Sequence, residues 1–296
     1  MIQDPHKILK EIEPTKEFFV GIDSDGCAFD TMEIKHKECF CPNVIKHWDL
    51  QKISKYVREA WDFVNLYSKT RGVNRFPALI EAVRLLSERD EVKARNAELP
   101  DLSSLIKWTQ EETKLGNAVL EKYEAEVNDP TITRALKWSL AVNETINEMV
   151  YGIPPFPFMR ESLEKLSEKA DAMVISQTPV EALTREWEEN DIKKYVSIIA
   201  GQEFGTKTEH LKFGAKGKYD DDKILMIGDA PGDMKAAKAN GVLFYPINPG
   251  HEEKSWERFY NEALDKFFAG EYKGDYENQV ISEFEKYLPS TPHWKG

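Results

Sequence analysis

The chain has 296 residues, of which 41% are hydrophobic and 31% are charged, and its formal net charge is −12. This composition is typical of a globular protein with a sizeable core, and the length allows about two domains. The negative charge argues against nucleic acid or an anionic membrane surface as the main partner. The start has no export signal, no apolar run could cross a bilayer, and the three cysteines suggest no disulfide framework. We therefore expect a cytoplasmic protein; the sequence does not indicate its oligomeric state.

The first strong pattern follows a lysine- and glutamate-rich start (residues 1–16) that could hold one short helix. Residues 18–22, Phe-Phe-Val-Gly-Ile, predict a buried strand of a parallel sheet, and Asp23 and Asp25 follow it directly. Ligands of open α/β sheets bind beyond the carboxyl ends of such strands. Two carboxylates this close repel each other unless a cation or a shared proton lies between them. This stretch therefore predicts a metal site.

The next long segment, residues 33–150, has helical periodicity and no convincing strand. Apolar residues fall on single helical faces, and residues 105–123 and 132–150 are two further helical stretches. The faces are made by Ile53, Val57, Trp61, Val64 and Tyr67, and by Phe76, Leu79, Ile80, Val83 and Leu86. Because the segment follows the first strand directly, we expect it to be an inserted helical domain at the active end of the sheet, where it can act as a lid.

From residue 151 onward, predicted strands alternate with predicted helices, as in an α/β parallel sheet. The strands are expected at 172–175, 196–200, 223–227 and 242–247. The first of these lies about 150 residues after the strand at 18–22, whereas a simple strand–helix–strand unit needs about 30. We therefore predict an α/β core (1–32 and 151–250), a helical domain (33–150) and a C-terminal helical extension (251–296).

Polar residues at the predicted strand ends indicate the chemistry. Ser176 and Thr178 follow the strand at 172–175, where a hydroxyl could bind phosphoryl oxygens or simply cap the next helix. Asp229 and Asp233 follow the strand at 223–227, and Asp233 could also serve as a helix cap. If Asp23, Asp25 and Asp229 converge, their oxygen atoms form a ligand set that suits Mg²⁺, whereas zinc would favour His or Cys.

Four motifs now occur in one order along the chain: Asp23-Ser24-Asp25-Gly26, then Ser176, then a lysine, and then the segment 228–233, Gly-Asp-Ala-Pro-Gly-Asp. The lysine is Lys207 or, as an alternative, Lys212. This pattern resembles the haloacid dehalogenase (HAD) superfamily of Asp-dependent phosphohydrolases. The helical insert is similar in position to the C1 cap of its phosphoglycolate phosphatase and β-phosphoglucomutase branch. The resemblance implies a Rossmann-like core under an all-helical cap.

The resemblance also implies roles for single residues. Asp23 would be the nucleophile that forms an aspartyl-phosphate, and Asp25 the general acid and base. Lys207 would counter the charge of the intermediate and Ser176 would hydrogen-bond the phosphoryl group, while Gly26 lets the backbone come close to it. The remaining assignments are Mg²⁺ on Asp23, Asp229, the Asp25 carbonyl and, through water, Asp233, and substrate contacts from Gly26, Gln177, Arg71 and Arg75.

Several alternatives remain at this point. Asp25 argues against dehalogenase and phosphonatase chemistry, because within the resemblance both lack this carboxylate. A phosphomutase keeps all four motifs and stays open, as does a non-catalytic phosphate-binding protein. The segment 65–75, which carries Arg71 and Arg75, is either a clamp for a second anionic group of the substrate or a solvated loop between helices. We expect a Mg²⁺-dependent phosphatase that acts on a small phosphorylated metabolite.

Overall fold

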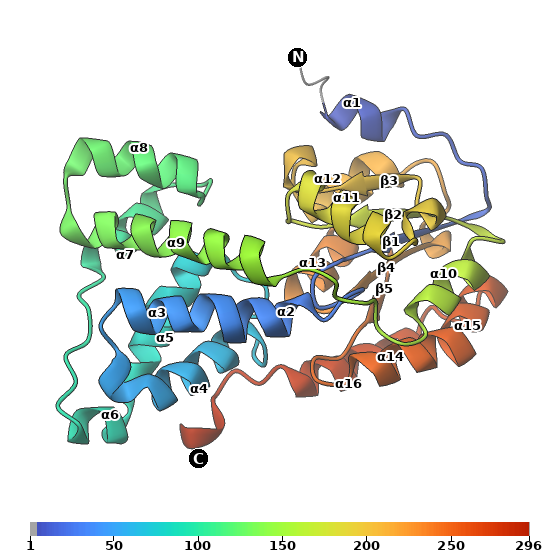
Figure 1. The fold of residues 1–296 in the computed structure, drawn as a ribbon. Coiled ribbons are helices and arrows are strands. Elements are labelled where there is room, and N and C mark those ends of the chain that lie inside the picture. Colours follow the sequence, from blue (N-terminus) through green and yellow to red (C-terminus); the bar gives the residue numbers. More distant parts are fainter. Residues whose placement is uncertain (1–4, 296) are drawn as a thin grey trace. The chain divides into compact units, whose positions relative to one another are not determined.

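The computed structural model describes residues 5–295, and their packing divides the chain into two compact units (Figure 1). The first unit combines residues 5–31 with 152–288. The second combines residues 32–151 with 289–295. The chain therefore passes between the units at three places in the sequence. Among the described residues, no helix is both long and apolar enough to cross a membrane.

The first unit contains a five-stranded parallel sheet with the strand order β3-β2-β1-β4-β5. All five strands lie where the sequence predicts them, and β1 is buried along its whole length, as its apolar run requires. The predicted α/β class with a parallel sheet is therefore confirmed. The strands are β1 (Phe18–Ile22), β2 (Ala170–Ile175), β3 (Ile198–Ala200), β4 (Ile224–Gly228) and β5 (Leu243–Pro246).

Helices cover both faces of this sheet. Successive side chains of a strand point to opposite faces, so apolar residues of one strand can pack against helices on either side. Val20 and Ile22 of β1 belong to one apolar cluster, and Phe19 belongs to another on the opposite face. The helices of this unit are α1 (Pro5–Lys10), α10 (Met159–Leu166), α11 (Val180–Glu189), α12 (Lys207–Gly214), α13 (Pro231–Asn240), α14 (Glu252–Arg258), α15 (Leu264–Ala269) and α16 (Asp275–Tyr287); a π-helical segment, Phe259–Ala263, joins α14 to α15.

The helices after residue 251, which the sequence pattern sets apart as an extension, pack against the sheet of the first unit. Trp256 lies in the same apolar cluster as Val20, and its indole nitrogen donates a hydrogen bond of 2.7 Å to the carbonyl of Cys27. Tyr272 donates a hydrogen bond of 2.7 Å to the carbonyl of Phe244 in β5. These helices thus complete the core beside the loop that follows β1.

The second unit contains only helices among its described residues, and aromatic side chains fill its core. Trp61, Trp108 and Trp138 are buried there. One predicted helical stretch, 105–123, is interrupted: α7 ends at Glu111, and α8 begins at Asn117 after an extended glycine, Gly116. The helices of this unit are α2 (Thr31–Ile34), which starts at the boundary, α3 (Cys41–His47), α4 (Ser54–Asn65), α5 (Arg75–Glu88), α6 (Asp90–Ala94), α7 (Ser103–Glu111), α8 (Asn117–Val127) and α9 (Pro130–Met149), with a π-helical segment Lys35–Phe40 between α2 and α3.

The C-terminal tail, residues 289–295, packs on the helices of this second unit. The Trp294 ring meets the Phe63 ring edge-on at 5.7 Å, and the guanidinium of Arg89 lies 4.6 Å from the Trp294 ring centre. Lys295 forms an ion pair with Glu88 of α5. The tail is therefore attached to α4 and α5 by an aromatic contact, a cation–π contact and an ion pair.

Candidate active site

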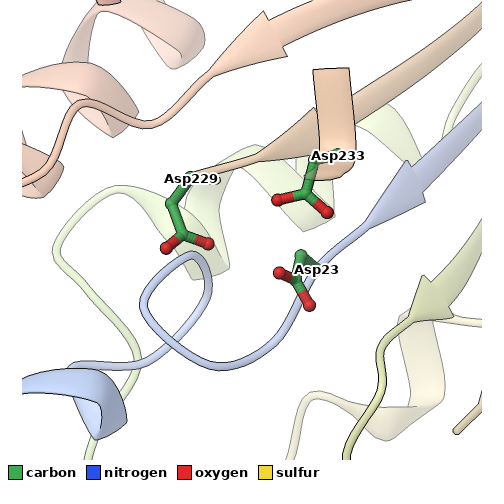
Figure 2. Close-up of side chains that lie close together, drawn as sticks. All are labelled: Asp23, Asp229 and Asp233. Atoms are coloured by element: carbon green, nitrogen blue, oxygen red, sulfur yellow. The ribbon is translucent and has the colours of Figure 1, made fainter. Parts of the chain in front are cut away.

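Three carboxylates meet at the carboxyl end of the sheet. β1 and β4 are neighbours in the sheet, so Asp23 and Asp229, which follow them, lie at the same edge. Asp233 joins them from the first turn of α13, where its carboxylate also accepts a hydrogen bond of 3.0 Å from the Ala230 amide. All three are buried, and one oxygen from each lies within 4.8 Å of the others. Figure 2 shows the three side chains gathered around one small space.

A single ammonium group lies against these carboxylates. The Nζ of Lys207 is 2.6 Å from Oδ2 of Asp23 and 2.5 Å from Oδ1 of Asp233. Lys207 is the first residue of α12, whose start is fixed by Thr206 and Glu209 in a reciprocal capping arrangement. Of the two lysines that the sequence left open, the structure brings Lys207 to the carboxylates. Lys212 is exposed, with its ammonium 5.5 Å from the centre of the Phe213 ring.

The pKa values of this group show that its carboxylates repel one another. Burial, together with the charges of Asp233 and Asp229, raises the pKa of Asp23 well above its usual value, although Lys207 opposes the rise. Burial works to lower the pKa of Lys207, but Asp23 and Asp233 outweigh it and raise that pKa. Lys207 pairs with Asp23 and Asp233, yet burial and the neighbouring carboxylates still raise the pKa of Asp23, so a divalent cation would relieve this repulsion. The oxygen-only donor set fits Mg²⁺.

The side chain of Asp25 lies outside this carboxylate group and is held by two hydroxyls. Thr31 donates a hydrogen bond to Oδ1, and Thr178 donates one of 2.6 Å to Oδ2. A metal contact from Asp25 would therefore have to come from its backbone carbonyl, as the resemblance implies. The arrangement leaves Asp23 and Asp25, two residues apart, in different surroundings: one beside an ammonium and carboxylates, the other between hydroxyls.

The other candidate residues of the first unit lie in the loops around these carboxylates. The hydroxyl oxygen of Ser176, at the end of β2, accepts a hydrogen bond of 3.2 Å from the Thr178 amide. Gln177 donates from its side-chain amide to the carbonyl of Gly205 at 2.9 Å. Gly26 has a positive φ of 75°, which its lack of a side chain permits, in the turn that carries Asp25. The predicted contacts of these residues with a substrate stay predictions.

The two candidate arginines of the second unit are engaged within that unit. Arg71 is buried, and its guanidinium donates a hydrogen bond of 2.8 Å to the carbonyl of Leu66. Arg75 is the first residue of α5 and donates to Ser139 and to Asn143, with its guanidinium 4.9 Å from the Phe40 ring centre. A clamp on a substrate anion would have to give up such contacts, so the clamp stays a prediction that these contacts do not favour.

Sequence patterns alone did not reveal the partners of Asp25. In the sequence, Thr178 is compatible with phosphoryl binding or helix capping, and no pattern marks Thr31. The position of Thr178 at the end of the strand beside β1 was the available signal, because the carboxyl ends of neighbouring parallel strands meet at one edge. No such signal existed for Ser24, whose buried hydroxyl donates to Glu186 at 3.1 Å and accepts from the Trp187 indole at 3.0 Å.

Several solved structures are similar to this chain. A haloacid dehalogenase-like hydrolase from Streptococcus pneumoniae is 14% identical, with 92% of this chain and 100% of that chain covered and a TM-score of 0.46. A protein of Lactobacillus delbrueckii subsp. bulgaricus, named as a candidate phosphoglycolate phosphatase, is 15% identical, with 83% and 92% covered and a TM-score of 0.47. At such identities and TM-scores the structures add nothing about function. No curated protein is similar enough to count as a match.

The model of one protein family matches more than half of the chain. It describes haloacid dehalogenase-like hydrolases and covers residues 73–247, which include Ser176, Lys207, Asp229 and Asp233. Asp23 lies before the matched range. The pairing of β1 with β4 brings it to the same edge of the sheet as Asp229, and its carboxylate contacts the ammonium of Lys207. The family match and the order of the motifs agree: the chain belongs to the haloacid dehalogenase-like hydrolases.

Proposed function

We propose that this protein is a Mg²⁺-dependent phosphatase that hydrolyses a small phosphorylated metabolite through an aspartyl-phosphate on Asp23. One observation supports the proposal above all: Asp23, Asp229 and Asp233 are buried together at the carboxyl end of the sheet, and the ammonium of Lys207 contacts two of them. Metal-binding carboxylates, a positive charge and a nucleophile are the groups that phosphoryl transfer requires at one place.

Each residue has a stated task in this reaction. A carboxylate oxygen of Asp23 attacks phosphorus in line with the bond to the leaving oxygen, and the Asp23–phosphate bond forms as that bond breaks. Asp25 donates a proton to the leaving oxygen. In the second step it takes a proton from the water that attacks phosphorus, and the Asp23–phosphate bond breaks as phosphate is released. Lys207 and the hydroxyl of Ser176 stabilise the negative charge on the phosphoryl oxygens. A bound Mg²⁺, held by Asp23, Asp229, the backbone carbonyl of Asp25 and, through water, Asp233, would screen the nucleophile from its anionic target.

We further propose that the helical unit, residues 32–151, is the cap that selects the substrate. Its position in the sequence, directly after the loop that carries Asp25, supports this role. An inserted unit next to a catalytic loop can close over a bound substrate and exclude water. The proposal predicts that exchanging residues of this unit changes KM among phosphorylated substrates more than it changes the chemical step.

The proposal is tested by activity and by trapping. The chain is assayed against phosphorylated sugars, sugar acids and nucleotides, with Mg²⁺ and with EDTA. Asp23→Asn should abolish release of phosphate, whereas Asp222→Asn, in an exposed turn before β4, should leave it unchanged. Rapid quenching followed by borohydride reduction should convert Asp23 to homoserine, which mass spectrometry detects. Near-normal turnover of Asp23→Asn, or activity undiminished in EDTA, would reject the proposal. Transfer of phosphate within a sugar, without release, would identify a phosphomutase instead.

A further inference from the structure

Thr178 connects the loop after β2 to the loop after β1 through a single side chain. Its hydroxyl donates a hydrogen bond of 2.6 Å to Oδ2 of Asp25, while the hydroxyl of Thr31 donates to Oδ1. Contacts at both oxygens fix the rotation of the carboxyl group as well as its position. Each carboxylate oxygen has two lone-pair positions, and the two hydroxyls occupy one on each oxygen.

Helix capping does not explain the Thr178 hydroxyl. A threonine just before a helix commonly accepts a hydrogen bond from the first turn. Helix α11 starts at Val180, and its N-cap residue is Pro179, which has no side-chain acceptor, so Thr178 stands one residue before the capping position. The Val180 amide instead donates to Oε2 of Glu203 at 3.0 Å. Glu203 therefore accepts the hydrogen bond from the first residue of α11, and the Thr178 hydroxyl donates its hydrogen bond to Asp25.

The backbone of Thr178 is held from two directions. Its amide donates to Oγ of Ser176 at 3.2 Å, and its carbonyl accepts from the Gln202 amide at 3.1 Å. Gly201, after β3, lies so close that a Cβ atom there would be 2.5 Å from the Thr178 carbonyl oxygen. A side chain that bonds a catalytic group keeps it in place only when its own backbone is fixed. These contacts fix it.

We infer that Thr178 is a positioning residue for the general acid and base, Asp25. The inference rests on the proposed phosphatase function and goes beyond it by assigning a task to a residue outside the four motifs. The Thr178 hydroxyl keeps the Asp25 carboxyl oriented toward the leaving oxygen, so that the proton moves as the bond to phosphorus breaks. General acid catalysis contributes about 10²- to 10⁴-fold to rates, and a misplaced acid loses part of this factor.

The test uses two substrates of similar shape whose leaving groups differ in their need for a proton. Phenyl phosphate releases a poorer leaving group than p-nitrophenyl phosphate does, so its hydrolysis depends more on the acid. Thr178→Val, which removes the hydroxyl at nearly constant shape, should lower kcat/KM, which reports formation of the aspartyl-phosphate, at least tenfold more for phenyl phosphate than for p-nitrophenyl phosphate. Thr178→Ser, which keeps the hydroxyl, should restore most of kcat/KM. The difference between the two substrates in Asp25→Asn measures the full contribution of the general acid.

Each outcome decides between the two proposals. Equal losses for both substrates in Thr178→Val, or no loss at all, would overturn the role of Thr178 while Asp25→Asn still discriminates between the substrates. Absence of discrimination in Asp25→Asn would overturn the acid role itself, and with it this inference. A crystal structure of Thr178→Val adds a measurement that needs no substrate: the Asp25 carboxyl should turn away from its place near residue 178. An unmoved carboxyl would contradict the inference even if the variant is less stable, as melting curves would report.

Discussion

Replacing Asp229 by Asn should make the protein more stable in EDTA and less able to use Mg²⁺. One oxygen of each carboxylate lies within 4.8 Å of the others, and two unit charges at that distance interact by about 3 kcal/mol at an effective dielectric constant of about 20. Asp229 lies near Asp23 and Asp233, and the ammonium of Lys207 offsets part of that charge. Protonation of Asp23, whose pKa burial raises, relieves a further part. We therefore expect the free energy of unfolding in EDTA to rise by about 1–3 kcal/mol.

The assay is thermal or urea unfolding of both chains in EDTA and in a Mg²⁺ series. The original chain should gain stability with Mg²⁺, by about 2.7 kcal/mol when free Mg²⁺ reaches 100 times its dissociation constant. Asp229→Asn should show little of this gain, and Asp222→Asn should behave like the original chain. A lower stability of Asp229→Asn in EDTA would refute the electrostatic reasoning. A full Mg²⁺ gain in that variant would remove Asp229 from the metal site.

Lys207→Met removes the ammonium beside Asp23 and Asp233, so unfolding in EDTA should become easier by about 3–5 kcal/mol, with partial recovery in Mg²⁺; stability unchanged in EDTA would contradict this. Burial, with the charge of Lys207, lowers the pKa of His210 from 6.5 to about 4. The unfolded chain therefore takes up this proton first, and stability should fall by up to about 3 kcal/mol between pH 6.5 and 4. His210→Gln should lack this part of the slope in urea unfolding. Trp294→Ala should weaken hydrogen-exchange protection in α4 and α5 by about 1–2 kcal/mol through loss of the Phe63 and Arg89 contacts, leaving β1 unaffected.

The sheet and the site carboxylates could be predicted from local patterns because parallel strands bring their ends together. The apolar run at 18–22 and the run at 224–227 each precede an aspartate, and their pairing in the sheet brings Asp23 and Asp229 to one edge. The strand pairing alone therefore predicts that the Asp23 and Asp229 carboxylates lie close together, although no sequence pattern gives the distance between them. The family match covers residues 73–247, a range that contains Ser176, Lys207 and Asp229.

Other features depend on contacts between distant residues, which no local pattern records. The choice between Lys207 and Lys212 is made by where α12 begins, since only its first residue reaches Asp23. From the sequence alone, the Thr178 hydroxyl could cap the helix that follows it. In the structure Glu203 accepts the hydrogen bond from the first residue of that helix, and the Thr178 hydroxyl donates to Asp25. Helical periodicity after residue 251 likewise does not reveal that those residues cover the sheet.

The tail that packs on the helical unit has a consequence for chimaeric proteins. Exchanging residues 32–151 for the insert of another hydrolase would remove Phe63, Glu88 and Arg89 but retain the segment that binds them. The Trp294 indole would then be left exposed, and exposed aromatic surface promotes aggregation. A chimaera built with two junctions should therefore be less soluble than one in which residues 289–296 are replaced or deleted as well.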